Sequence, residues 1–151
     1  MGEAVARRRV VEMLRVLAER LRVYGLRSLV LTGSYARGEQ LRDSDIDAII
    51  VAEAFEGLPF YEREYLVLRE WSYPDPLEPW CYTSREVLEH VFRRPRIDLI
   101  DALEYGIVVY DDGFWRSVRE TYAQRPYRRR AIDGAHYALE LEPQTRETSS
   151  P

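Results

Sequence analysis

The first part of the chain carries hydrophobic residues at the spacing of one helix face. They recur every three or four positions, which is typical of an amphipathic helix packed against a core. The residues of this stripe are Val10, Leu14, Leu17, Leu21 and Tyr24. Gly25 follows directly, and glycine commonly ends a helix because it adopts the left-handed conformation freely. We therefore predict that the helix ends before Gly25.

Two apolar runs that follow are too short for helices and are predicted to be strands. The first is residues 29–31, and the second is residues 46–52, which are apolar almost throughout. A strand with an apolar residue at nearly every position is covered on both faces of its sheet. Between the two runs, we expect Ser34 to cap a short helix and Gly38 to end it.

The rest of the chain continues to alternate between helical and extended patterns. Thr83 and Glu86 form a capping-box sequence, which predicts a helix that begins there and runs to about residue 91. Further helices are predicted at 61–71, 97–105 and 114–122, and further strands at 77–82 and 106–110. A chain that alternates strands and helices in this way is an α/β domain.

The length of 151 residues is that of a single domain. We assign residues 1–140 to this domain. Residues 141–151 are mostly polar and are predicted to form a disordered tail. A content of 46% hydrophobic and 32% charged residues describes a globular protein, and no apolar run approaches the roughly 20 residues of a membrane-spanning helix.

Net charge and cysteine content bear on nucleic-acid binding and on the location of the protein in the cell. The net charge of −4 argues against general nucleic-acid binding, which needs a basic surface. The arginine runs at 7–9 and 128–130 are expected to be solvated helix ends. The charged start of the chain lacks the apolar stretch of a signal peptide, and the single Cys81 cannot form an internal disulfide. We therefore expect a cytoplasmic protein.

The candidate chemistry lies between the first two predicted strands. Asp45 and Asp47 open the second strand one residue apart, so their side chains point to the same face of the sheet. Two such carboxylates repel each other unless a cation lies between them, and carboxylate oxygens suit Mg²⁺. Upstream, Gly33 lets the backbone approach a ligand closely, and the Ser34 hydroxyl suits a phosphate. The pattern predicts a site for a metal ion and a phosphorylated substrate.

Two segments of this region resemble a known family. The segments are Gly33-Ser34-Tyr35-Ala36-Arg37-Gly38 and Ser44-Asp45-Ile46-Asp47. They resemble the nucleotidyltransferase superfamily related to DNA polymerase beta, and within it the minimal nucleotidyltransferase-domain proteins of antitoxin type. The resemblance implies a polymerase beta-like nucleotidyltransferase fold, with a mixed sheet of about four to five strands and helices mainly on one side.

The resemblance also implies roles for the residues of both segments. Asp45 and Asp47 would hold Mg²⁺, and two ions are expected because such sites use a pair of metals. The residues implied to contact the nucleotide are Gly33, Ser34, Arg37 and Ser44. A phosphate would pair with the planar guanidinium of Arg37, although a short surface helix would explain this arginine equally well.

A third carboxylate is implied on the strand predicted at 77–82. Glu78 stands where the family usually has Asp, so its oxygens would reach the metal from further back. The next residue, Pro79, lacks a backbone donor and favours an edge or irregular strand. Asp75 and Asp98 compete for this role, but Asp75 lies between prolines and Asp98 lies on a predicted helix.

The implied function is Mg²⁺-dependent transfer of a nucleoside monophosphate, expected to be AMP from ATP, to a hydroxyl acceptor. One implied acceptor is a tyrosine on a small all-helical partner of the HEPN type, in a toxin–antitoxin pair. Self-association is left open. The alternative is a catalytically weak protein that binds a nucleotide or a protein partner on the same scaffold. A chain of this length has no room for the thumb and finger domains of a polymerase.

Overall fold

A computed structural model describes residues 2–41, 44–134 and 137–141. Its helices are α1 (Glu3–Leu21), α2 (Gly33–Arg37), α3 (Phe60–Glu70), α4 (Ser84–Phe92), α5 (Ile97–Tyr105) and α6 (Phe114–Gln124), with the short 3-10 helices η1 (Arg22–Tyr24) and η2 (Glu53–Phe55). Its strands are β1 (Leu26–Thr32), β2 (Ile46–Ala52), β3 (Leu77–Tyr82), β4 (Ile107–Asp111), β5 (Tyr127–Ala131) and β6 (Tyr137–Leu141). The predicted α/β domain is confirmed. No helix in these ranges is long and apolar enough to cross a membrane.

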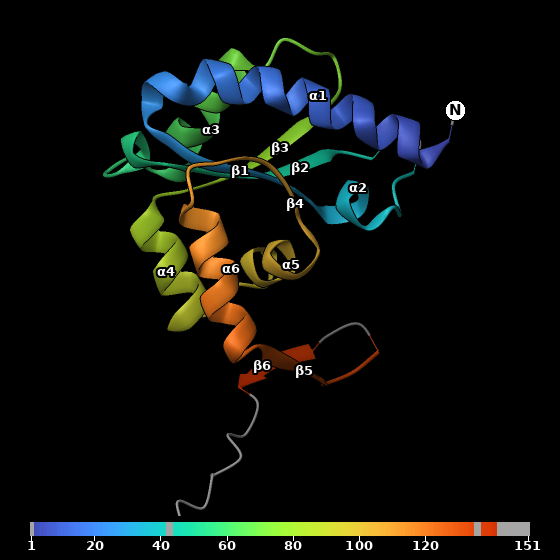
Figure 1. Cartoon of the computed structure of the whole chain (residues 1–151), viewed down its shortest axis with the longest axis vertical. Coiled ribbons are helices and arrows are strands. Elements are labelled where there is room, and N and C mark those ends of the chain that lie inside the picture. The colour runs from blue at the N-terminus through green and yellow to red at the C-terminus, as the bar shows by residue number, and fades with distance from the viewer. Residues whose placement is uncertain (1, 42–43, 135–136, 142–151) are drawn as a thin grey trace, which may run out of the picture.

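Strands β1 to β4 form one mixed sheet in the order β3-β2-β1-β4 (Figure 1). β2 pairs in parallel with β3 and antiparallel with β1, and β1 also pairs antiparallel with β4. β3 is therefore an edge strand, which is where a sheet tolerates proline. Pro79 keeps the regular parallel register, opposite Ala48, so it does not distort the strand that carries Glu78.

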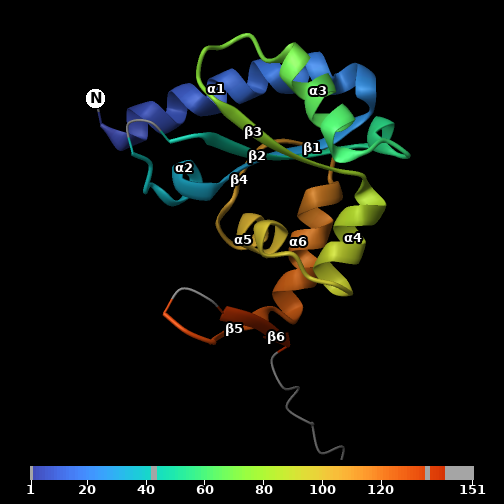
Figure 2. The same ribbon diagram turned by 180° about the vertical axis from the view of Figure 1, so that it is seen from behind.

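Helices cover both faces of this sheet, as Figures 1 and 2 show from opposite sides. α1 and α3 lie over one face, and α4, α5 and α6 lie over the other. The alternation of β2 divides its side chains between two cores: Ala48 and Ile50 pack on the α1 side, whereas Ile49 and Val51 pack on the α4–α6 side. The structure thus differs from the expectation of helices mainly on one side. The physical reason is the apolar run of β2, which leaves no face for solvent.

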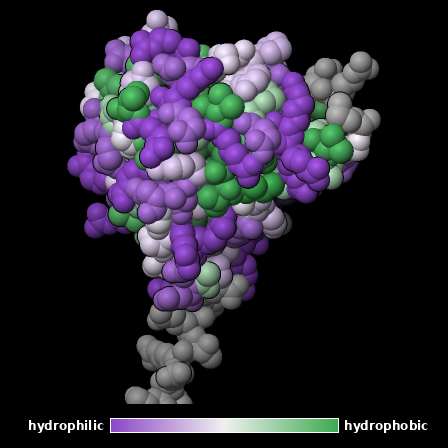
Figure 3. All heavy atoms as spheres, turned by 45° about the horizontal axis from the view of Figure 1, so that its top comes forward, coloured by the Kyte–Doolittle hydropathy of each residue, from purple (hydrophilic) through white to green (hydrophobic). Residues whose placement is uncertain are grey.

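The amphipathic pattern of the first helix is confirmed. Buried residues of α1 follow one stripe: Val10, Met13, Leu14, Leu17, Ala18 and Leu21. Gly25 adopts the left-handed conformation (φ 69°) directly after η1 and ends the helical segment. Figure 3 brings the α1 side of the molecule forward and shows hydrophilic residues over most of that face, with hydrophobic ones between them.

Two local features differ from the sequence-based expectations. Thr32, with an extended backbone, is the N-cap of α2, so Ser34 lies inside the helix and is not its cap. Gly33 causes this difference, because its positive φ of 69° already turns the chain out of β1. Gly38 ends α2 in the left-handed conformation, as expected.

The larger difference is a hairpin that was not predicted. β5 and β6 pair antiparallel and form a separate two-stranded sheet. The arginine run at 128–130 lies within β5 and not at a helix end, because the chain after α6 is extended. The tail expected over residues 141–151 lies outside the described residues, except for Leu141, which ends β6.

Candidate functional site

Three neighbouring strands bring three polar side chains level with one another. In the register of the sheet, Thr32 of β1 lies opposite Asp47 of β2, and Asp47 lies opposite Glu78 of β3. Val30 of β1, Ile49 of β2 and Tyr82 of β3 pack toward α4–α6. Thr32, Asp47 and Glu78 lie two or four residues from them on the same strands, and side chains an even number of positions apart point to the same face. Thr32, Asp47 and Glu78 therefore share one face at one end of the sheet.

The side chains of Asp47 and Glu78 line the same cavity from directly opposite positions on β2 and β3, and the two carboxyl groups interact. Burial, together with the hydrogen bond and the negative charge of Glu78, raises the pKa of Asp47 from its usual range to about 6, and a hydrogen bond from the Trp80 indole partly opposes this rise. Two neighbouring carboxyl groups share a proton or hold a cation, because two negative charges side by side repel each other. The pair is therefore the electrostatic centre of the site.

Gly33 packs directly against Asp47. Its φ of 69° is one that other residues rarely adopt, and a Cβ atom there would lie 2.4 Å from Oδ2 and 3.1 Å from Cγ of Asp47. A side chain at this position would therefore have to displace the Asp47 carboxyl group, which favours glycine. Sequence reasoning did not identify this contact with Asp47. Close approach of the backbone to a ligand stays a prediction.

A cavity of about 300 Å³ opens over the pair. Its lining residues are Thr32, Gly33, Arg37, Asp47, Glu78, Trp80, Asp98 and Asp101. The structure therefore brings together four of the seven residues predicted to form the site: Gly33, Arg37, Asp47 and Glu78. Asp45 is exposed at the entrance to β2 and acts on Asp47 only as a nearby charge.

The two serines are not among the lining residues of this cavity. The Ser34 carbonyl accepts the N–H of Glu39 at 2.9 Å inside the turn of α2. The Ser44 hydroxyl accepts the N–H of Leu41 at 2.7 Å. Both residues shape the loop that joins β1 to β2. Their contact with a nucleotide stays a prediction.

The opposite wall of the cavity comes from α5, whose role the sequence did not reveal. Asp98 and Asp101 are three residues apart and so project from one side of the helix. Of the two competitors for the third carboxylate, Asp98 does line the cavity. Asp75 instead pairs with Arg9 of α1 at 3.1 Å and is not among the lining residues. The helical spacing of Asp98 and Asp101 is the one signal that could have found them.

Both α5 carboxylates are already held by neighbours. The Tyr82 hydroxyl donates to Asp98 at 2.5 Å, and Arg96 donates to the other oxygen at 3.1 Å. Burial and this hydrogen bond raise the pKa of Tyr82 far above its usual range, so the phenol stays protonated. Arg37 donates to Asp101 at 2.7 Å. These contacts fix α5 relative to β3 and α2.

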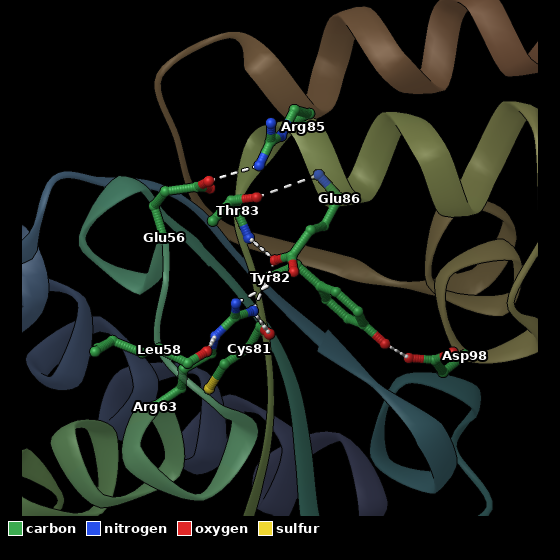
Figure 4. A network of polar contacts seen from close by, with 9 residues as sticks. All are labelled: Glu56, Leu58, Arg63, Cys81, Tyr82, Thr83, Arg85, Glu86 and Asp98. Carbon is green, nitrogen blue, oxygen red and sulfur yellow. Dashed lines mark hydrogen bonds and ion pairs between the residues drawn. The ribbon is translucent and has the colours of Figure 1, made fainter.

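A buried arginine fixes the far end of β3 (Figure 4). Arg63 of α3 is only 6% exposed and donates to the Cys81 carbonyl at 3.1 Å and to the Glu86 carboxylate at 2.6 Å. Burial raises the pKa of Glu86, but the hydrogen bonds from Arg63 and from Thr83 outweigh it and leave that pKa lowered. Thr83 and Glu86 form the capping box predicted from the sequence. The ion pair with Arg63 was not predicted, since nothing in the α3 sequence marks this arginine as buried.

The donor set fits a divalent ion only in part. Among the described residues, no three His, Cys, Asp or Glu side chains lie close enough together to hold a metal ion by themselves. Mg²⁺, however, is commonly bound by one or two carboxylates and completed by substrate phosphates and water. The Asp47–Glu78 pair meets that requirement, with Arg37 nearby for phosphate oxygens.

Comparison with known proteins gives a family and a fold. A family model described as a nucleotidyltransferase domain matches residues 12–128, which is more than half of the chain. No curated protein matches the chain. Among solved structures, the chain is similar to a protein of Sulfolobus solfataricus assigned as a nucleotidyltransferase, with a TM-score of 0.55 and 18% identity over 74% of this chain and 89% of that one. At this identity the likeness shows the fold alone.

Two further similar structures are toxin–antitoxin complexes. One was solved with AMP-PNP, and its similarity has a TM-score of 0.46 and 19% identity over 78% of this chain and 86% of that chain. The other is a mutant MntA–HpeT toxin–antitoxin, with a TM-score of 0.47 and 18% identity over the same shares of the two chains. These TM-scores are too low to carry an argument about this chain.

Proposed function

Because the chain belongs to the nucleotidyltransferase domain family, we propose that it transfers the nucleoside monophosphate of a nucleoside triphosphate to a hydroxyl acceptor in a Mg²⁺-dependent reaction. ATP is the expected donor. The acceptor oxygen forms a bond to the α-phosphorus while the bond to the leaving pyrophosphate breaks. The observation that carries the proposal is the register of Asp47 with Glu78, which places two carboxyl groups beside Gly33 in one cavity.

The residues of the site can each be given a chemical role in the proposed reaction. Asp47 and Glu78 would hold Mg²⁺, and a bound ion neutralises charge on the phosphates. Gly33 leaves room for Asp47 and for the backbone to approach a phosphate. Arg37 offers a planar donor to phosphate oxygens. Asp45, exposed just before β2, adds negative charge near Asp47 that favours the cation, and the proposal includes a second metal ion near Asp45.

The identity of the hydroxyl acceptor is the more specific part of the proposal. A hydroxyl acceptor would enter from the open side of the cavity. A tyrosine of a small all-helical HEPN-type partner is the acceptor that the resemblance implies. Among the described residues, no three carboxylates lie close enough together to share a metal ion, which favours a second candidate, a nucleotide-binding protein with weak turnover on the same scaffold.

Isothermal titration with ATP and MgCl₂ tests the site. We expect Asp47→Asn and Glu78→Gln to weaken Mg²⁺-dependent ATP binding at least tenfold, since loss of one hydrogen-bonded charge at such a site costs about 1.5–3 kcal/mol. Asp75→Asn is the matched control, because it makes the same change in a carboxylate paired with Arg9 outside the cavity. The site is misassigned if Asp47→Asn and Asp75→Asn bind ATP equally well.

A further inference from the structure

The catalytic cavity shares a wall with a second, larger one. The second cavity measures about 540 Å³ and is lined by Ala36, Arg37, Glu39, Asp101, Tyr105 and Arg129. Arg37 and Asp101 line both cavities. The shared wall is therefore an ion pair between α2 and α5, and whatever controls this pair acts on both cavities.

Asp101 holds two arginines at once. Its Oδ2 accepts from Arg37 at 2.7 Å, and its Oδ1 accepts from Arg129. Arg129 also donates to Glu104 at 2.7 Å, and Glu104 accepts the Tyr122 hydroxyl at 2.7 Å. The Asp101 side chain is only 18% exposed and that of Arg129 only 27%, so these charges are screened less than those of a surface pair.

Arg129 comes from outside the part of the chain that the family model matches. That match ends at residue 128, whereas Arg129 lies in β5 of the C-terminal hairpin. Figures 1 and 2 both show the hairpin beyond α5 and α6, on the side of the molecule away from the sheet. The hairpin thus adds a cation to the wall of a site that is otherwise built from the matched domain.

The charges of the catalytic cavity explain why such a cation matters. Among the described residues, its lining carries four carboxyl side chains, those of Asp47, Glu78, Asp98 and Asp101, against one basic side chain, that of Arg37. A triphosphate brings further negative charge into this space. Without Arg129, the negative charge of Asp101 would repel the triphosphate and would pair more strongly with Arg37. Both effects are large in this partly buried space, because Coulombic interactions strengthen as the surroundings become less polar.

We propose that Arg129 is a positioning residue of the nucleotide site: it neutralises Asp101, so that Arg37 can turn from Asp101 to the triphosphate. This inference rests on the proposed function. The hairpin then contributes a residue that nucleotide binding depends on. Its effect passes from Arg129 through Asp101 to Arg37, so the three residues must act as one unit in nucleotide binding.

The test is titration of ATP with Mg²⁺ into variants of the full chain. Arg129→Ala should weaken binding about tenfold, the size expected for loss of one hydrogen-bonded charge. Arg130→Ala is the matched control: it removes the same charge from the same hairpin, but Arg130 pairs with Glu140 of β6 and lines neither cavity. It should bind ATP as the wild type does. Arg129→Lys should keep most of the affinity, because it retains the charge.

The double variant Arg129→Ala/Asp101→Asn separates positioning from a structural role. The neutral amide that replaces the Asp101 carboxylate neither repels the triphosphate nor competes for Arg37, so the double variant should recover wild-type affinity. Loss of hairpin docking alone would leave the double variant as weak as Arg129→Ala, and that result overturns the inference. Equal affinity of Arg129→Ala and wild type overturns it as well. If the wild type itself binds no nucleotide, the proposed function fails and the inference falls with it.

Discussion

Gly33→Ala is the substitution whose cost follows most directly from the geometry. The left-handed φ of 69° penalises any side chain by about 1–2 kcal/mol. The new Cβ would also lie 2.4 Å from Oδ2 of Asp47, so the carboxyl group must move. That movement disturbs the hydrogen bond from Trp80 to the carboxylate, at about 1 kcal/mol more. The sum is about 2–3 kcal/mol, or roughly 4–12 °C in Tm for a chain of this size.

Gly57→Ala is the control for the backbone part of this cost. Gly57 has a similar φ of 77°, but a Cβ there meets nothing within 4 Å. Thermal unfolding of both variants separates the cost of backbone strain from the cost of the contact with Asp47. Both variants gain the same stability from the smaller entropy of the unfolded chain, so this gain cancels in the comparison. Gly33→Ala should lose about 1 kcal/mol more stability than Gly57→Ala and should also lose ATP binding. Equal stability and intact ATP binding in both variants would refute the contact between Gly33 and Asp47.

Two further predictions concern stability. Arg63→Ala should lower the free energy of unfolding by about 3–5 kcal/mol in denaturant, because it leaves the Glu86 charge unpaired. The control, Arg85→Ala, breaks the ion pair of an arginine that is 79% exposed and should cost at most about 1 kcal/mol. Similar losses in the two variants would contradict the network of Figure 4. The raised pKa of Asp47 means that the folded protein binds more protons than the unfolded chain between about pH 4 and about 6, so its stability should fall as pH rises through that window. Asp47→Asn should lose less stability over the same window in a pH series of Tm values, and parallel curves for the two proteins would count against the raised pKa.

Most elements of the fold were predictable because their signals are local. The helical stripe of α1, the capping box of Thr83 and the apolar run of β2 each depend on residues close in sequence. The hairpin of β5 and β6 carries a weaker signal. Its first strand is Tyr-Arg-Arg-Arg-Ala, in which the polar residues on both faces give no amphipathic alternation. A strand of this kind is recognised only in the structure, where its pairing with β6 is visible.

The candidate site was predictable as far as it depends on strand periodicity. Asp47, Gly33 and Glu78 were all expected in it, and Glu78 lies beside Asp47 because β3 pairs in register with β2. The α5 carboxylates were not predicted to lie together there, since which helix faces the sheet end depends on tertiary packing. The same holds for the burial of Arg63, whose place in α3 is ordinary in sequence.

The central claim, transfer of a nucleoside monophosphate at the Asp47–Glu78 site, is tested most directly by the fate of two labels. The protein is incubated with Mg²⁺ and a candidate hydroxyl acceptor, here a co-encoded small helical protein, and with ATP labelled at either the α- or the γ-phosphate. We predict that the α-label appears on the acceptor, that the γ-label leaves as pyrophosphate, and that Glu78→Gln abolishes both. Transfer of the γ-label to the acceptor, or undiminished transfer by Glu78→Gln, would contradict the claim.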